Sequence, residues 1–207
     1  MQKMKGRKIK FIFVLLIAVG MMASCNTSPY TPKPRGYFRI DLPEKQYVLL
    51  DTTFPYSFEY PTYATVNPDL HSPNEKYWIN LDFKPFNATL HLSYKKVNGN
   101  LISYLEDAHT LVTKHIPKAD AIYDSLIVDR QRNVFGLTYK IEGSGAASPY
   151  QFFLTDSTTH FLRGALYFNT VPNNDSLQPV IDFIQKDIEH LVGTLQWKKL
   201  PTDNPIR

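Results

Sequence analysis

Cysteine is almost absent from this 207-residue sequence, since Cys25 is the only one. A single thiol excludes an internal disulfide and a zinc site made of several thiolates. Acidic residues are missing from positions 1–24, which hold five Lys or Arg residues. Of the 23 Lys and Arg in the whole chain, 18 therefore follow position 24, as do all 19 Asp and Glu. The positive and negative charges behind position 24 are thus nearly balanced. The overall charge of +4 thus gives no support for nucleic-acid binding.

The sequence also lacks an apolar run long enough to cross a bilayer as a helix. The uncharged run from Phe11 to Ala23 has 13 residues, whereas a membrane-spanning helix needs about 20. A basic start, a short apolar core and small residues at Ala23 and Ser24 are typical of an export signal. The alternative interpretation is an uncleaved membrane helix.

The position of Cys25, directly after Ala23-Ser24, resembles a bacterial lipobox, in which the thiol is acylated and the chain is cut just before it. Met22 stands where that motif usually has Leu. Acyl chains such as palmitate on a diacylated cysteine give stable membrane anchoring. We therefore expect residues 1–24 to be a lipoprotein signal peptide and Cys25 to carry the lipid, the alternative being an unmodified thiol.

Proline marks the segment behind the cysteine. Residues 25–35 contain Pro29, Pro32 and Pro34, and a chain of this kind forms a semi-stiff tether of about 3.1 Å per residue. Cations and aromatic residues then alternate, which gives the candidate partner-binding residues Lys33, Arg35, Tyr37, Phe38 and Arg39. They form either a basic stripe beside phospholipid headgroups, with the aromatic residues tucked into the domain, or a docking segment for a partner protein.

Residues 36–207 suit one globular domain rich in strands. Short extended pieces are expected at 46–50 and 56–60, and alternating apolar and polar residues predict strands at 77–83 and 88–94, joined by a hairpin. A four-stranded meander is predicted behind them, at 125–129, 134–142, 150–156 and 160–169.

Two helices are predicted from apolar residues three or four positions apart. The first begins at a cap on Asn98 or Asn100 and stops at Pro117, and its apolar stripe is Leu101, Leu105, Ala108, Val112 and Ile116. The second covers about 177–192, with Pro179 in its first turn. Its apolar stripe is Leu177, Ile181, Ile184, Ile188 and Leu191, and its polar side is Asp187, Glu189 and His190.

No alternation of strand and helix is sustained along the chain, so we expect an α+β fold with a mainly antiparallel sheet and two principal helices packed on it. The order of elements is similar to the fold shared by PsbP and the nuclear-transport factor Mog, a likeness that carries no function. Phe153 is out of phase with its neighbours, so it either meets a helix on the second face or is exposed for a partner. Gly136 and Gly164 inside strands predict bulges or the close approach of a helix.

No constellation of residues indicates catalysis or metal binding. The six histidines lack the spacing of metal ligands, and the loop at 143–145 lacks the lysine of a phosphate-binding loop. The best polar cluster lies on the hairpin of the last two strands and consists of Gln151, Thr155, Asp156, His160 and Arg163. Within it, Asp156 is expected to pair with Arg163 across the hairpin, and His160 to join them. Cross-strand pairs of this kind are usually structural. We therefore expect no catalytic residue, no cofactor, no metal site and no enzymatic activity.

The residues behind the cysteine resemble a known family. The run Pro32-Lys33-Pro34-Arg35-Gly36-Tyr37-Phe38-Arg39-Ile40-Asp41, followed by Pro43-Glu44-Lys45, is similar to the start of the GldD family of gliding-motility lipoproteins from Bacteroidetes. The likeness continues through four further stretches, at 58–61, 91–95, 151–157 and 160–168.

This resemblance implies a lipoprotein that is required for gliding motility and tied to the type IX secretion machinery. It implies no enzymatic activity and no ligand, so no catalytic residues carry over. Surface-displayed lipoproteins of that phylum often have acidic residues just after the cysteine. Residues 26–29 contain none, which favours the periplasmic side of the outer membrane.

Three hypotheses follow. The first is a non-enzymatic lipoprotein, anchored to the outer membrane, that docks on other motility and type IX secretion proteins of the cell envelope. The second is a periplasmic lipoprotein that binds a small ligand, such as a lipid, a glycan or a peptidoglycan fragment. The third is a hydrolase built on Asp156, His160 and Arg163.

Overall fold

The computed structural model describes residues 36–37 and 39–199. Residues 39–199 belong to one compact unit. Cys25, Lys33, Arg35 and Phe38 lie outside the described residues, as does the whole of the expected signal peptide at 1–24 and tether at 25–35. These domain boundaries therefore stay predictions.

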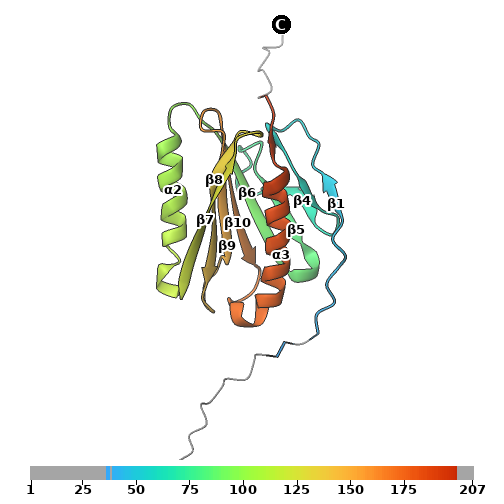
Figure 1. Cartoon of the computed structure of the whole chain (residues 1–207). Coiled ribbons are helices and arrows are strands. Elements are labelled where there is room, and N and C mark those ends of the chain that lie inside the picture. The colour runs from blue at the N-terminus through green and yellow to red at the C-terminus, as the bar shows by residue number, and fades with distance from the viewer. Residues whose placement is uncertain (1–35, 38, 200–207) are drawn as a thin grey trace, which may run out of the picture. The chain divides into compact units, whose positions relative to one another are not determined.

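A seven-stranded antiparallel sheet is the framework of the domain (Figure 1). Its strands lie in the order β4-β5-β6-β10-β9-β8-β7. They span Thr65–Pro68 (β4), Ile79–Phe83 (β5), Ala88–Lys96 (β6), Ala121–Asp129 (β7), Val134–Glu142 (β8), Tyr150–Thr155 (β9) and His160–Phe168 (β10). The predicted hairpin and the predicted meander are both confirmed, and the last strand of the meander pairs back onto β6.

Two helices cover opposite faces of this sheet (Figure 1). On one face α3 (Asn174–Thr194) packs on the larger core, to which it contributes Ile184, Ile188 and Leu191. On the other face α2 (Leu101–Thr113) packs on a smaller core through Ala108 and Val112. The predicted α+β fold, with two helices on an antiparallel sheet, is confirmed.

Short strands surround the α3 side of the domain. They form two small antiparallel pairs, β1 (Tyr47–Leu49) with β3 (Glu59–Pro61) and β11 (Gln196–Trp197) with β2 (Tyr56–Ser57). Tyr56 and Phe58 are fully buried in the larger core. The N-terminal pieces are thus part of the domain, as the extended segments at 46–50 and 56–60 predicted.

Several element ends differ from the predictions. Ile116 is 59 % exposed because α2 ends at Thr113, before the short 3-10 helix Ile116–Lys118, so Ile116 does not belong to the apolar stripe. The residue before a proline is disfavoured in an α-helix, which explains the early end. Pro179 lies inside α3 and not in its first turn, because α3 already begins at Asn174.

Phe153 meets the helix on the second face, which confirms one of its two interpretations. It is 8 % exposed and belongs to the same core as Ala108 and Val112 of α2. The expected bulges at the two strand glycines are absent, since the strand register runs unbroken through both. A Cβ at Gly136 would lie 1.9 Å from the carbonyl oxygen of Phe153, and one at Gly164 would lie 2.2 Å from the ring of Phe152. A neighbouring strand and an aromatic ring, not a helix, require these glycines.

Candidate functional site

The described part of the predicted docking segment is exposed. Tyr37 is 45 % exposed. The side chain of Arg39 is 92 % exposed, and its Nε donates a hydrogen bond to Asp41 at 3.2 Å. An ion pair this exposed contributes little to stability. The side chains of Tyr37 and Arg39 are therefore accessible to a partner, as the docking interpretation requires.

A buried carboxylate fastens the chain behind this segment to α3. Asp187 is 1 % exposed, and its Oδ1 accepts hydrogen bonds from Lys45 Nζ at 2.5 Å and from the Tyr47 hydroxyl at 2.8 Å. Its Oδ2 accepts a hydrogen bond from the Tyr63 hydroxyl. Lys45 Nζ also lies 3.7 Å from the centre of the Phe183 ring. Asp187 is thus buried and was wrongly placed on the polar side of the helix.

The pKa values of Tyr47 and Tyr63 respond to the buried Asp187 carboxylate. Burial, and then the hydrogen bond to the Asp187 carboxylate, raise the pKa of both Tyr47 and Tyr63 well above the ordinary value. Both hydroxyls therefore stay protonated and remain donors to the carboxylate. Beside them His190 stacks on Tyr47, and its Nε2 lies 2.7 Å from the Glu59 carboxylate. The α3 surface thus holds β1 and β3 in place.

A groove of about 410 Å³ lies between α2 and the sheet. Three aromatic side chains line it, Tyr104 on α2, Phe161 on β10 and Trp78 just before β5, together with the cations Lys95, Lys114 and Arg163. An aromatic wall with a few charged groups is typical of a small-ligand site. No local pattern in the sequence indicates this groove, because α2 and β10 are far apart along the chain.

Strand β7 lies at one edge of the seven-stranded sheet (Figure 1). Within the described residues, no strand pairs with this edge. The strand has nine residues without proline, and it leaves Tyr123 55 %, Leu126 74 % and Val128 54 % exposed. The opposite edge of the sheet is β4, a strand of four residues that includes Pro68. Short strands and prolines protect a sheet edge from pairing with other chains, so one edge is protected and the other is open.

The sequence model of the gliding motility lipoprotein GldD family matches residues 27–197. The chain belongs to the GldD family of gliding motility lipoproteins. This match confirms the resemblance found in the sequence and establishes the coarse role, a lipoprotein of gliding motility that is associated with the cell envelope.

Other comparisons add little for this GldD-family chain. No curated protein matches it. Its structure is similar to the solution structure of cyanobacterial PsbP from Synechocystis sp. PCC 6803, with a TM-score of 0.44 and 9 % sequence identity. The match covers 77 % of this chain and 97 % of the PsbP chain. A likeness of this degree carries no argument about fold or function.

The structure brings Gln151 to Arg163, as the predicted polar cluster requires, but it separates Asp156 from Arg163. Asp156 accepts hydrogen bonds from the backbone N–H groups of Thr158, Thr159 and His160. Burial opposes the charge of this carboxylate, but the backbone hydrogen bonds prevail and lower the pKa of Asp156. Asp156 therefore closes the turn between β9 and β10 and does not pair with Arg163.

His160 and Arg163 lie on opposite faces of the sheet, since side chains three positions apart in a strand point to opposite sides. His160 is buried, with Nδ1 2.8 Å from the Tyr94 hydroxyl and its ring stacked on Trp197. Arg163 donates a hydrogen bond to Gln151 Oε1 at 2.6 Å. The expected Asp156–Arg163 pair was wrong.

Within residues 36–37 and 39–199, no three His, Cys, Asp or Glu side chains are grouped so that they could hold a metal ion. No helix in this part of the chain is long and apolar enough to span a membrane.

Proposed function

We propose that this protein is a non-enzymatic component of the gliding-motility and type IX secretion machinery. A lipid on Cys25 anchors it to the outer membrane, and the domain faces the periplasm. Family membership supports the role in motility. The observation that carries the docking function is the open edge of β7.

An edge strand offers a row of backbone donors and acceptors, and only another extended segment can pair with all of them. The occupant of β7 is an extended segment of another envelope protein of the machinery. Leu126 and Val128 alternate along β7 and face the same side of the sheet, so the incoming strand carries apolar residues on that side. Asp124 is exposed on the same side, so a Lys or Arg opposite it completes the pairing.

The test is crosslinking of the intact, lipidated protein in its own envelope, with a photoreactive residue in place of the exposed Ser125. We expect mass spectrometry to identify motility or secretion subunits. The double variant Leu126→Lys and Val128→Lys places charge on the edge, and we expect it to lose both the crosslinks and surface spreading.

The matched control is Ile102→Lys on α2, because Ile102 is an exposed apolar side chain of similar kind at 72 % exposure. It should keep both the crosslinks and spreading. Normal spreading of the β7 double variant would refute docking at this edge. If crosslinks join only two copies of this chain, the occupant of the β7 edge is a second copy of the chain and not another envelope protein.

A second candidate function is the binding of a small ligand, and the groove under α2 favours it. Its aromatic walls and its volume of about 410 Å³ suit a small molecule. Docking at β7 and binding in this groove use different residues, so the two functions can be tested separately.

A further inference from the structure

Arg163 is the unusual residue of the groove under α2. It is half-buried on β10, where burial lowers the pKa of its guanidinium and the Tyr167 hydroxyl opposes that shift. Its guanidinium donates a hydrogen bond to a neutral amide oxygen, Gln151 Oε1. Among residues 36–37 and 39–199 no carboxylate lies within ion-pair distance of it. A cation withdrawn from water without an anionic partner is costly unless a ligand supplies the anion.

The neighbours of Arg163 add positive charge. Lys95 and Lys114 line the same groove, and Asp107 is its only acidic lining residue. Burial and then the charge of Arg163 lower the pKa of His115, which follows α2. The electrostatics of the groove therefore favour an anion.

A second observation points to a missing acceptor in this region. The amide nitrogen of Gln151 is buried and has no hydrogen-bond partner, and no other buried side-chain nitrogen or oxygen in the described part of the chain shares this property. Gln151 is 1 % exposed, and its amide oxygen is already used by Arg163. A buried donor without a partner costs stability. The unsatisfied amide nitrogen of Gln151 belongs to the side chain that is hydrogen-bonded to Arg163.

The floor of the groove follows from the strand register. On the sheet face turned to α2, Arg163 lies directly opposite Ser93, and Phe161 lies directly opposite Lys95. Lys95 Nζ is 4.8 Å from the centre of the Tyr104 ring, which places its charge beside the aromatic wall. The groove therefore combines cations and an aromatic wall in one volume of about 410 Å³.

We propose that this groove binds a small amphiphilic anion. Its carboxylate or phosphate group accepts hydrogen bonds from Arg163, with Lys95 and Lys114 as additional cations. Its apolar portion packs on Trp78, Tyr104 and Phe161. The inference deepens the second candidate function by naming the chemical class of the ligand, and it is independent of docking at β7.

The fluorescence of Trp78 reports ligand binding, because Trp78 lines the groove. The chain has one other tryptophan, Trp197. A Trp197→Phe background leaves Trp78 as the single reporter. The full lipidated chain, held in neutral phosphatidylcholine vesicles, is titrated with 4-phenylbutyrate, with 4-phenylbutyl phosphate and with neutral 4-phenylbutanol. We expect saturable changes in Trp78 fluorescence with the two anions and none with the alcohol, and the tighter anion distinguishes a carboxylate ligand from a phosphate ligand.

The variant Arg163→Gln should raise the Kd of the anion by about tenfold or more, because hydrogen bonds to charged groups are strong. Lys114→Gln is a milder variant of an exposed side chain that leaves the sheet intact, and it should raise the Kd several-fold. Lys186→Gln, an exposed lysine on α3, is the matched control and should bind like the parent.

The proposal is overturned if no anion perturbs Trp78 up to millimolar concentration, if the alcohol binds equally well, or if Lys186→Gln weakens binding as much as Lys114→Gln. Failure here leaves the docking function untouched. The β7 double variant is expected to bind the anions normally, and Lys114→Gln is expected to keep the crosslinks to partner proteins.

Discussion

At the scale of single residues, Asp187 shows how one carboxylate joins parts of the chain that are remote in sequence. Its three donors come from Lys45, Tyr47 and Tyr63, so the segments before and after β1–β3 meet on α3. Removing one partner of a buried ion pair leaves an uncompensated charge, which is more destabilising than the pair is stabilising. Asp187 is therefore one of the contacts that position the segments around β1 and β3 on α3.

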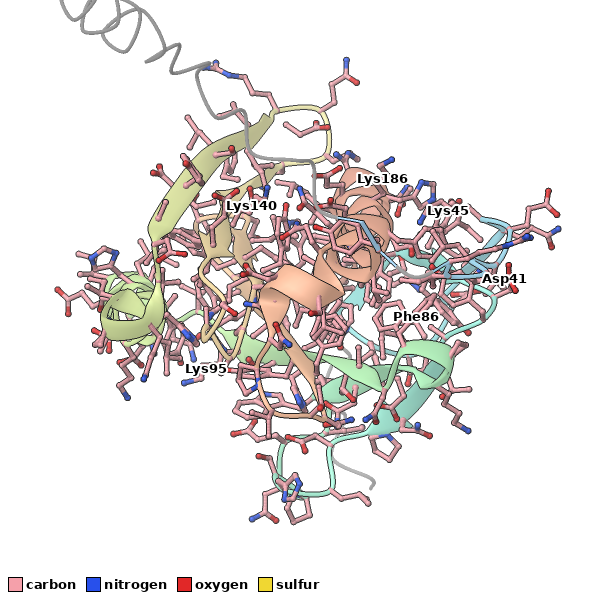
Figure 2. All side chains as sticks on the ribbon, turned by 90° about the horizontal axis from the view of Figure 1, so that it is seen from below. Asp41, Lys45, Phe86, Lys95, Lys140 and Lys186 are labelled. Atoms are coloured by element: carbon pink, nitrogen blue, oxygen red, sulfur yellow. The ribbon has the colours of Figure 1, made fainter. Side chains whose placement is uncertain are left out.

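We expect Lys45→Met to lower the free energy of unfolding by about 3 kcal/mol, since Asp187 then stays buried without its cation. Urea denaturation of the full chain measures this change. The control is Lys186→Met, one position before Asp187 but exposed (both lysines are labelled in Figure 2), and it should change stability by less than about 0.5 kcal/mol. Equal stability of the two variants would mean that the ion pair does not hold the segment.

His160 makes the stability of the domain dependent on pH. Burial lowers its pKa in the folded protein, whereas the unfolded chain keeps a value of about 6.5. Between these two values the unfolded state binds more protons, so stability falls as the pH drops through about 6.5. His91 and His115 shift in the same direction.

We therefore expect Tm to fall between about pH 7.5 and about pH 5.5, and we expect His160→Gln to flatten this dependence. Calorimetry of the full chain at several pH values measures it. His109→Gln, an exposed histidine on α2, is the control and should keep the slope of the parent. A slope unchanged in His160→Gln would assign the pH dependence to other groups.

At the scale of elements, the sequence predicts best where one face of a strand or helix is buried. The strand Val134–Glu142 has the predicted bounds because the alternating residues Leu137, Tyr139 and Ile141 face the core under α2. The start of α3 could not be predicted, since Asn174 is fixed by contacts to the carbonyl oxygens of Gly143 and Ala146. Those partners lie about thirty positions earlier and leave no local pattern.

The candidate sites depend on the order of the strands, which is a tertiary property. Because β10 pairs with β6, β7 is left at the edge of the sheet, and its exposed apolar residues become available to a partner. In the sequence the same residues predict an ordinary strand. The pair Lys45 and Asp187 is separated by 142 positions, and each residue alone is typical of a surface charge.

At the scale of the whole molecule, function depends on how the domain is attached to the envelope. The family establishes a lipoprotein, and the lipid on Cys25 stays a prediction. The exposed residues Tyr37 and Arg39 belong to the segment for which two interpretations were left open, a stripe beside lipid headgroups and a docking segment. These interpretations differ in what a change of charge would do to membrane attachment and to motility.

We expect Arg35→Glu with Arg39→Glu to abolish surface spreading while the protein stays folded and in the membrane fraction. A diacylated and N-acylated cysteine anchors the chain without help from basic residues, so the charge reversal removes the docking contact alone. Cell fractionation and spreading assays measure the two effects. Cys25→Ser is the control for attachment and should leave the membrane fraction.

The control for charge is Lys84→Glu with Lys186→Glu, two exposed lysines of the folded domain, and this variant should spread normally. Normal spreading of the Arg35 and Arg39 variant would remove the segment from the docking surface. Its release from the membrane would instead favour the headgroup stripe, because a docking residue contributes nothing to attachment once the lipid is in place.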